Sequence, residues 1–334
     1  MMKFENASYL TQVKRMHLIA QEALENYPIK VKKIELKRYA ANATYKVTDF
    51  HNKNYQLRIH PKEWHTKAEI LEELHWLKHL RKTTDIVSPR PIPAKSGQYV
   101  IKCGHSLQSI RLCELFEWLP GRKRWHSINK QYAQDLGELV GKLHKNGQSM
   151  RIKHRHFWNA DSLVGTNKAR YYNVEKLSYV NKNQQTIITK ARREVYSELN
   201  HYEKIYKNKS GLIHGDVQPN NILYLHHNIE IIDFDDCGIG LYIYELATAL
   251  HAFYQLTNRN KNKSYKELEK ALFDGYSKVM PLAEEDIQLV PYCILAVKLM
   301  TIGWLEHNKD NLNLRQHYSP AIEGAIQYFE QYKC

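Results

Sequence analysis

The sequence predicts an α+β fold with two lobes, a small N-terminal lobe built on an antiparallel sheet and a larger helical C-terminal lobe. A chain of 334 residues is too long for one compact core. Short β-branched and aromatic runs gather between residues 34 and 119, whereas long helical periodicities dominate the rest of the chain. Pro120-Gly121 separates the two parts, so we place the lobes at residues 1–120 and 121–334.

The N-terminal lobe is expected to begin with an amphipathic helix over residues 9–27, because apolar side chains recur at helical spacing as far as Pro28. A second helix should start at Thr66, since Thr66 and Glu69 have the form of a capping box. A stiff, proline-rich segment over residues 89–93 follows it. Strands are expected at residues 34–38, 45–50, 55–59, 99–102 and 110–119.

The C-terminal lobe is expected to be mainly helical. We expect Asn146-Gly147 to close its first helix with a left-handed cap. Leu212-Ile213 should deliver the chain into a polar loop. Helices are predicted at residues 130–145, 186–207, 244–255, 284–306 and 320–332.

The composition indicates a folded chain, with 43% hydrophobic residues and 23 tyrosines. No apolar run is expected to approach the length of a membrane span, and the N-terminus is expected to lack a signal-peptide core. Five cysteines without a CxxC motif argue against a disulfide framework and fit a reducing cytoplasm. The formal charge of +14 favours anionic partners, but the basic residues are scattered, so we expect a solvated basic surface and no specific nucleic-acid binding.

The segment from His214 to Asp236, HGDVQPNNILYLHHNIEIIDFDD, is the most informative part of the chain. Asp216 and Asn221 lie five residues apart in a polar loop, and two apolar runs follow, the second ending at Asp233. These runs predict a β-hairpin with carboxylates and an amide at its open end. Phosphoryl transfer requires such groups: a carboxylate that orients the hydroxyl nucleophile, with an Asn and an Asp that hold Mg²⁺ on the phosphates.

These residues resemble the aminoglycoside phosphotransferase family, which includes choline and homoserine kinase-like members and has a protein-kinase-like fold. The family pattern, H-G-D-x-x-x-x-N and then hydrophobic-D-hydrophobic, is matched at each position. The resemblance covers about residues 35–250. It implies that Asp216 is the catalytic base, that Asn221 and Asp233 are magnesium ligands, and that ATP and Mg²⁺ are the cofactors.

The resemblance also implies roles for residues of the small lobe. Arg58 stands where protein kinases have a lysine, and its guanidinium would hold phosphate oxygens of ATP. Glu73 is expected to pair with Arg58, although it could instead be a surface residue paired with Lys78 or Arg81. The expected nucleotide loop, residues 39–44, has no glycine.

Residues 115–121 resemble the family's hinge between the lobes. By that resemblance the backbone of Glu117, Trp118 and Leu119 would face the adenine of ATP. Glu245 stands where the family usually has Asp, and we expect it to be structural.

Other polar residues allow alternatives. Asp235 would share a strand face with Asp233 and could be an alternative metal ligand. Of the 18 histidines, His75 and His79 have a spacing that can bind zinc, but without an HExxH pattern or a third ligand we expect them to face solvent. His214 is expected to pack beneath the loop and to hydrogen-bond its backbone.

The function so implied is transfer of the γ-phosphate of ATP to a hydroxyl of a small molecule of the aminoglycoside, amino-alcohol or sugar class, in the cytoplasm. A cationic acceptor would need carboxylates. Candidates are Glu284, Glu285, Asp286, Glu306 and Glu323. Two alternatives remain, a protein Ser/Thr kinase of the stress-response type and a non-catalytic, pseudokinase-like binding module; fold sharing does not decide the substrate.

Overall fold

The chain divides into two compact units. Unit 1 comprises Met1–Gly121 and Glu230–Asp235, and unit 2 comprises Arg122–Ile229 and Asp236–Cys334. Asp233 and Asp235 therefore belong to unit 1, although they follow the loop of unit 2 in sequence. This computed structural model describes residues 7–39, 42–106, 109–123, 128–165, 169, 174, 176–225, 228–259, 264–309 and 311–332.

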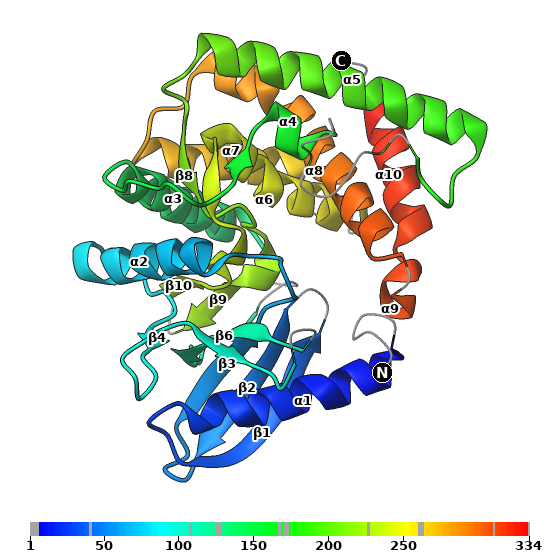
Figure 1. Cartoon of the computed structure of the whole chain (residues 1–334). Coiled ribbons are helices and arrows are strands. Elements are labelled where there is room, and N and C mark those ends of the chain that lie inside the picture. The colour runs from blue at the N-terminus through cyan, green and yellow to red at the C-terminus, as the bar shows by residue number, and fades with distance from the viewer. Residues whose placement is uncertain are drawn as a thin grey trace. The chain divides into compact units, whose positions relative to one another are not determined.

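Unit 1 is built on a six-stranded antiparallel sheet (Figure 1). The strand order is β1-β2-β3-β6-β4, with β5 paired to β6. The predicted helices and strands are present with ends shifted by a few residues, and a short strand, β4, lies in the segment that was expected to be a stiff proline-rich connection. They are α1 (Tyr9–Glu25), β1 (Val31–Tyr39), β2 (Ala43–Asp49), β3 (Asn54–Ile59), α2 (Lys67–Thr83), β4 (Pro91–Ile92), β5 (Ile101–Cys103) and β6 (Arg111–Glu117).

The core of unit 1 lies between α1 and the sheet. Ile19, Ala23 and Leu24 of α1 join a buried cluster with strand residues such as Tyr45 and Leu57. Burying one such large apolar side chain contributes about 1.5–3 kcal/mol, so the amphipathic spacing of α1 determines how it packs.

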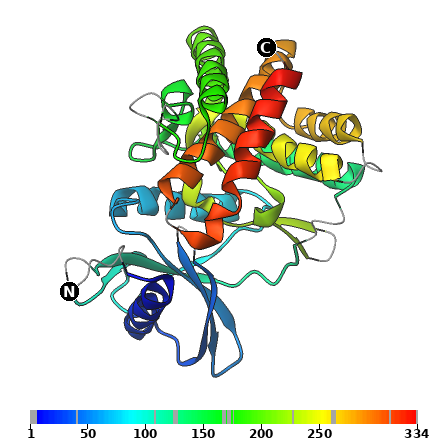
Figure 2. The same ribbon diagram turned by 90° about the vertical axis from the view of Figure 1, so that its right-hand side faces the viewer.

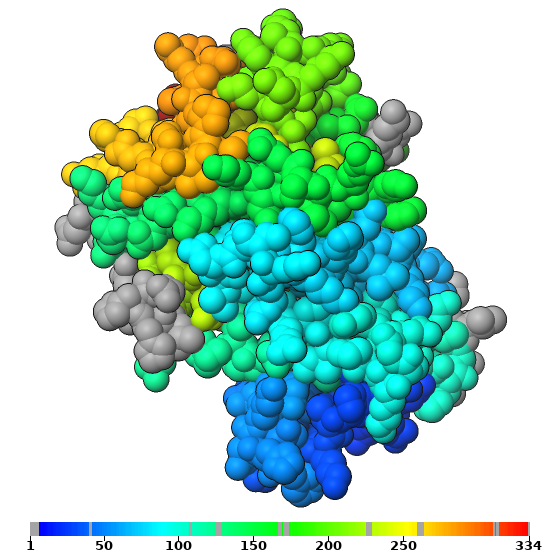
Figure 3. Space-filling view, turned by 90° about the vertical axis from the view of Figure 1, so that its left-hand side faces the viewer, coloured from blue at the N-terminus to red at the C-terminus, as the bar shows by residue number. Residues whose placement is uncertain are grey.

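The capping box that starts α2 is present. The Thr66 hydroxyl accepts a hydrogen bond from the Glu69 amide at 3.2 Å, and Glu69 accepts one from the Thr66 amide at 2.7 Å. This start places Glu73 on the buried face of the helix with Leu74 and Leu77. The opposite face of α2 is exposed to solvent (Figure 3).

Unit 2 contains most of the helices (Figures 1 and 2). In its three-stranded sheet, β11 runs antiparallel to β8 and parallel to β7, and β9 pairs with β10 (Asn228–Ile231) in a separate hairpin. The other elements are α3 (Lys130–Gly147), β7 (Phe157–Trp158), α4 (Ala160–Leu163), α5 (Lys182–Ile205), β8 (Ser210–Ile213), β9 (Ile222–Leu225), β11 (Gly238–Leu241), α6 (Tyr242–Arg259), α7 (Tyr265–Ser277), α8 (Glu284–His307), α9 (Leu312–Arg315) and α10 (Tyr318–Gln331).

The cap expected at the end of the first helix of unit 2 was wrong. Gly147 is not a left-handed cap, because α3 continues through it and ends at Gln148 with φ −61°. Glycine packs closely there, since a β-carbon would lie 3.0 Å from both the Cβ and the carbonyl oxygen of Leu212 and these atoms would have to shift slightly. Helix α7 was not predicted; its backbone packs against α3 at Gly137 and Gly275, where a β-carbon would clash with the carbonyl oxygen of the facing helix.

Helix α8 corrects the expectation that no apolar run approaches the length of a membrane span. It is long and apolar enough to cross a membrane, with a mean hydropathy of 1.5, but 61% of the apolar window is buried inside the protein. It packs against α5, α6 and α10 (Figure 2), as the central helix of a globular unit does.

Candidate active site

The loop after β8 is shaped by Gly215. Its φ of +84° lies in the left-handed region that favours glycine. A β-carbon there would clash with the carbonyl oxygen of Asp236 and lie 2.9 Å from Nε1 of Trp158. The same Nε1 donates a hydrogen bond to that carbonyl oxygen at 2.7 Å. The chain can therefore turn tightly into Asp216 only with glycine at this position.

Asp216 and Asn221 lie side by side in this loop. Nδ2 of Asn221 donates to Oδ2 of Asp216 at 2.7 Å and to its carbonyl oxygen at 3.0 Å. Nε2 of Gln218 donates to the other carboxylate oxygen, Oδ1, at 2.7 Å. Both oxygens of Asp216 are thus oriented by neutral donors.

The orientation of Asn221 leaves its amide oxygen for another partner. Because Nδ2 faces Asp216, Oδ1 points elsewhere, and no described residue donates to it. Amide and carboxylate oxygens are the hard ligands that Mg²⁺ prefers. Asn221 therefore offers an amide oxygen of the kind that a magnesium ion binds.

A buried His–Glu pair supports the loop from behind. Oε1 of Glu245 accepts the Gly215 amide at 2.6 Å, and its Oε2 lies 2.8 Å from Nε2 of His144. Burial would raise the pKa of Glu245, but the hydrogen bond and charge of His144 lower it overall. His214 is fully buried and accepts the Asp216 amide through Nδ1 at 3.2 Å. The structural roles expected for Glu245 and His214 are confirmed.

In unit 1, Arg58 lies in a buried cluster of carboxylates. Its Nη2 lies 2.5 Å from Oε1 of Glu73, and its Nε donates to Oε1 of Glu114 at 2.5 Å. Burial would lower the pKa of Arg58, but these acids raise it well above the usual value. The expected Arg58–Glu73 pair is therefore present, and the alternative of a surface Glu73 is wrong because its exposed fraction is 1%.

Sequence reasoning missed Glu114. The register of β3 and β6 places it directly across from Arg58. Cross-strand neighbours of this kind interact strongly, but their identity depends on a pairing register that the sequence alone did not provide.

Asp233 follows β10 with a left-handed backbone, φ +69°. A 3₁₀ turn over Phe234–Asp236 comes next, so the strand does not continue and Asp233 and Asp235 do not share a strand face as expected. Oδ1 of Asp233 lies 3.5 Å from Nη1 of Arg58, and its side chain is 33% exposed. Such a backbone conformation in a non-glycine residue costs about 1–3 kcal/mol and is typical of functional sites.

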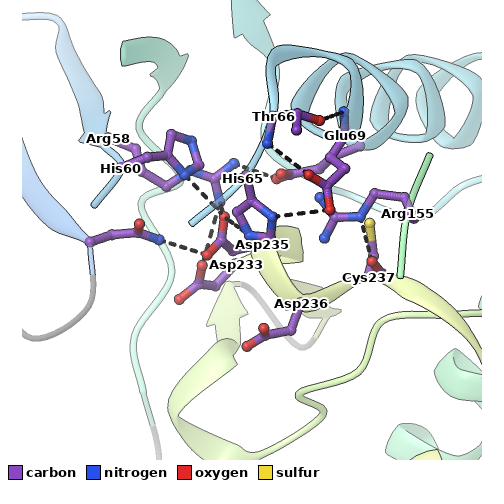
Figure 4. A network of polar contacts seen from close by, with 12 residues as sticks. Arg58, His60, His65, Thr66, Glu69, Arg155, Asp233, Asp235, Asp236 and Cys237 are labelled. Atoms are coloured by element: carbon purple, nitrogen blue, oxygen red, sulfur yellow. Dashed lines mark hydrogen bonds and ion pairs between the residues drawn. The ribbon is translucent and has the colours of Figure 1, made fainter. Parts of the chain in front are cut away.

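Asp235 has buried partners of its own (Figure 4). Its Oδ1 lies 3.4 Å from Nδ1 of His60 and 3.3 Å from Nε2 of His65, and its Oδ2 accepts Nδ2 of Asn42 at 2.9 Å. Burial would raise the pKa of Asp235, but the charges of His65 and Arg58 lower it well below its usual value. Sequence reasoning missed both histidines and considered His75 and His79 instead.

The predicted hinge residues follow β6. The amide of Glu117 donates to the carbonyl of Arg90 at 2.9 Å, and the amide of Trp118 donates to that of Asn54 at 3.2 Å. No described residue accepts the amide of Leu119. Of the three residues, Leu119 therefore has the backbone donor that remains for another partner.

The five acids that were proposed to bind a cationic acceptor each contact another residue of unit 2. Asp286 contacts Tyr202 and Lys209 and caps α8 through the Ala283 amide. Glu306 accepts hydrogen bonds from Ser178. The remaining contacts are Glu284 with Gln288, Glu285 with Lys209, and Glu323 with Ser319.

With this geometry established, the family is clear. Residues 34–282 match the model of the phosphotransferase enzyme family, and the chain belongs to that family. It is a kinase that phosphorylates hydroxyl groups of small molecules. That reaction uses ATP with a divalent cation.

Relatives of several specificities resemble the chain. It is 23% identical to amicoumacin kinase of Bacillus subtilis (strain 168), over 78% of this chain and 76% of that protein. It is 24% identical to homoserine kinase of Agrobacterium fabrum (strain C58), but over only 61% of this chain and 58% of that one.

Solved structures agree on the fold. A microcompartment-associated aminopropanol kinase is 25% identical with a TM-score of 0.82, and the match covers 95% of this chain and 97% of that one. An amicoumacin kinase in complex with AMP-PNP and Ca²⁺ is 21% identical with a TM-score of 0.79, covering 96% of both. The protein-kinase-like fold expected from the motif is confirmed.

Proposed function

We propose that the chain transfers the γ-phosphate of ATP to the hydroxyl of a small amino alcohol, with Asp216 as the catalytic base. The observation that carries this proposal is the arrangement of Asp216, which Gln218 and Asn221 hold by both carboxylate oxygens. A carboxylate fixed in this way can accept the proton of an incoming hydroxyl without reorganising.

The residues that would hold the cofactors follow from their donor atoms. Asn221 and Asp233 would bind the divalent cation, which when bound neutralises charge on the phosphates. Arg58, held by Glu73, would donate to phosphate oxygens. The backbone at Glu117, Trp118 and Leu119 would face the adenine, with the Leu119 amide as the donor left for it.

In the reaction, the acceptor hydroxyl loses its proton to Asp216 as its oxygen bonds to the γ-phosphorus. The bond from that phosphorus to the bridging oxygen of ADP breaks, and ADP leaves. Positioning supplies most of the rate in such transfers, so the hydrogen bonds that fix Asp216 contribute alongside its role as proton acceptor.

The amino-alcohol class is supported by the relatives. Kinases of aminopropanol, homoserine and choline appear among them, and these acceptors carry a hydroxyl close to an amine. The acids expected to bind that amine are all paired within unit 2, so other residues would have to recognise it. We also propose a cytoplasmic location, since the four described cysteines are buried thiols that form no disulfide.

Neither alternative is supported by a specific observation. A protein Ser/Thr kinase has no counterpart among the relatives named above, which act on small molecules. A non-catalytic module would have no need for the hydrogen bonds that fix Asp216.

The test is an acceptor panel followed by Asp216→Asn. Ethanolamine, 1-amino-2-propanol, choline, homoserine and kanamycin would be compared with 1,2-propanediol and casein by ADP release and by ³¹P NMR of the product. We expect turnover with an amino alcohol and none with the diol or casein. Asp216→Asn should lower kcat by about 10²–10⁴-fold while AMP-PNP still binds. Transfer to casein alone, or near-full turnover by Asp216→Asn, would contradict the proposal.

A further inference from the structure

Two buried histidines converge on Asp235 in unit 1 (Figure 4). His60 directly follows β3, and His65 directly precedes the N-cap of α2. Their near nitrogens lie 3.4 and 3.3 Å from the same carboxylate oxygen, Oδ1 of Asp235. One possible ligand atom from each of the three residues lies within 4.8 Å of the other two.

The far nitrogen of each histidine faces a second carboxylate. Nε2 of His60 lies 2.9 Å from Oε1 of Glu114, and Nδ1 of His65 lies 3.8 Å from Oε1 of Glu69. The His60 contact is a hydrogen bond, whereas the His65 contact is an ion-pair distance. A histidine that donates its far N–H to a carboxylate presents the lone pair of its near nitrogen to a metal. This carboxylate–histidine arrangement surrounds most metal-binding histidines.

The charge of the cluster also favours a cation. Three buried carboxylates, of Glu73, Glu114 and Asp235, lie within 4.0 Å of the buried guanidinium of Arg58. With neutral histidines these four residues carry a formal charge of −2. Buried charge without compensation is strongly unfavourable, and one divalent cation would balance it.

We propose that His60, His65 and Asp235 form a binding site for a transition-metal dication such as Zn²⁺. Two imidazoles and a carboxylate select such ions over Mg²⁺, which prefers oxygen ligands, so this site is distinct in chemistry from that of Asn221 and Asp233. Ligands about 2.0–2.1 Å from a tetrahedral zinc lie roughly 3.3–3.4 Å apart, close to the observed separations from Oδ1 of Asp235.

The site would also connect to the nucleotide loop. The second oxygen of Asp235 accepts a hydrogen bond from Asn42, which directly precedes β2 in the β1–β2 connection. A metal that fixes Asp235 would therefore hold this connection in place. The proposal itself concerns metal binding, and it can fail or succeed independently of kinase activity.

The competing explanation of the charge is that both histidines are protonated and pair with Asp235. The two explanations differ in one observable. A metal ligand must offer a deprotonated ring nitrogen, whereas a charged imidazolium carries a proton on both nitrogens.

The test uses the full chain, stripped with a chelator and kept in excess Mg²⁺, with Co²⁺ and Zn²⁺ as probes. We expect one equivalent to bind, with a tetrahedral Co²⁺ absorption spectrum and a rise in Tm with Zn²⁺. His60→Gln and His65→Gln should each weaken binding by at least about tenfold. The double variant His75→Gln/His79→Gln, on the solvent-facing side of α2, serves as the matched control and should bind as the unchanged chain does.

Equal binding by the His65→Gln variant and the unchanged chain would overturn the proposal. Histidine side-chain ¹⁵N NMR of the unchanged chain keeps the test decisive if the variants fail to fold. One deprotonated nitrogen in each of His60 and His65 with Zn²⁺ present supports the site; doubly protonated rings in both would overturn it.

Discussion

The buried acids of the two units are paired with basic side chains in different ways. In unit 2 each buried acid has its own partner: Glu245 pairs with His144, and Asp286 pairs with Lys209. In unit 1 three buried acids share Arg58. The loop of unit 2 is thus fixed by its own hydrogen bonds, whereas three buried acids of unit 1 depend on one shared guanidinium.

The largest expected loss of stability comes from replacing Arg58, the side chain that the buried acids of unit 1 share. Arg58→Met should destabilise the protein by about 3–5 kcal/mol, because it leaves buried carboxylates without a counter-charge. The measurement is urea-induced unfolding followed by fluorescence.

Lys209→Met provides the comparison in unit 2. The side chain of Lys209 is only 21% exposed, and its shortest ion pair is with Asp286. Asp286 also contacts Tyr202, so it keeps a partner when Lys209 is replaced. Lys209→Met should therefore lower the free energy of unfolding clearly less than Arg58→Met does. Equal destabilisation by the two variants would mean that the charge imbalance of unit 1 has no energetic consequence.

A smaller loss of stability is expected when the hydrogen bond from the Gly215 amide to Glu245 is removed. Glu245→Ala leaves the buried Gly215 amide without its acceptor, which should cost about 1–3 kcal/mol and lower kcat. Glu245→Gln keeps an acceptor for that amide and should retain most of the stability. Thermal unfolding and steady-state kinetics on both variants check this; a Glu245→Ala variant with unchanged kcat would show that Asp216 does not depend on this support.

The smallest effect concerns acid stability in unit 2. Burial would raise the pKa of Glu306, but hydrogen bonds from Ser178 and Tyr318 lower it to about 2. Because the folded pKa lies below the unfolded value, Glu306 contributes stability above about pH 4.5 that is lost as the pH falls towards 2. The Tm difference between the unchanged chain and Glu306→Gln should therefore shrink over that range. A constant difference would argue against the shift.

The sequence predicted the unit 2 loop because its determinants are local. His214, Gly215, Asp216 and Asn221 lie within eight residues, and their contacts follow from one tight turn. The cluster of unit 1 depends on the β3–β6 register and on a turn at Asp233 that ends the strand. Those features are tertiary, so Glu114 could not be identified from spacing.

The histidines of unit 1 also show that contacts between distant parts of the chain cannot be identified from sequence spacing. His75 and His79 have a suggestive spacing on one helix, whereas His60 and His65 flank a turn and meet Asp235 from 170 or more residues away in sequence. Helix α7 was also missed; Gly275 lowers its helix propensity in isolation, and its contact with α3 at Gly137 is tertiary.

The most direct test of the account is the affinity of the protein for a divalent ion when a nucleotide is bound. Electron paramagnetic resonance of Mn²⁺ with saturating AMP-PNP would measure it for Asn221→Ala, Asp233→Asn and Asp216→Asn. We predict that the first two weaken Mn²⁺ binding by at least about tenfold and that Asp216→Asn changes it little. Unchanged Mn²⁺ affinity in Asp233→Asn or Asn221→Ala would contradict the assignment of these residues as the metal ligands of a kinase.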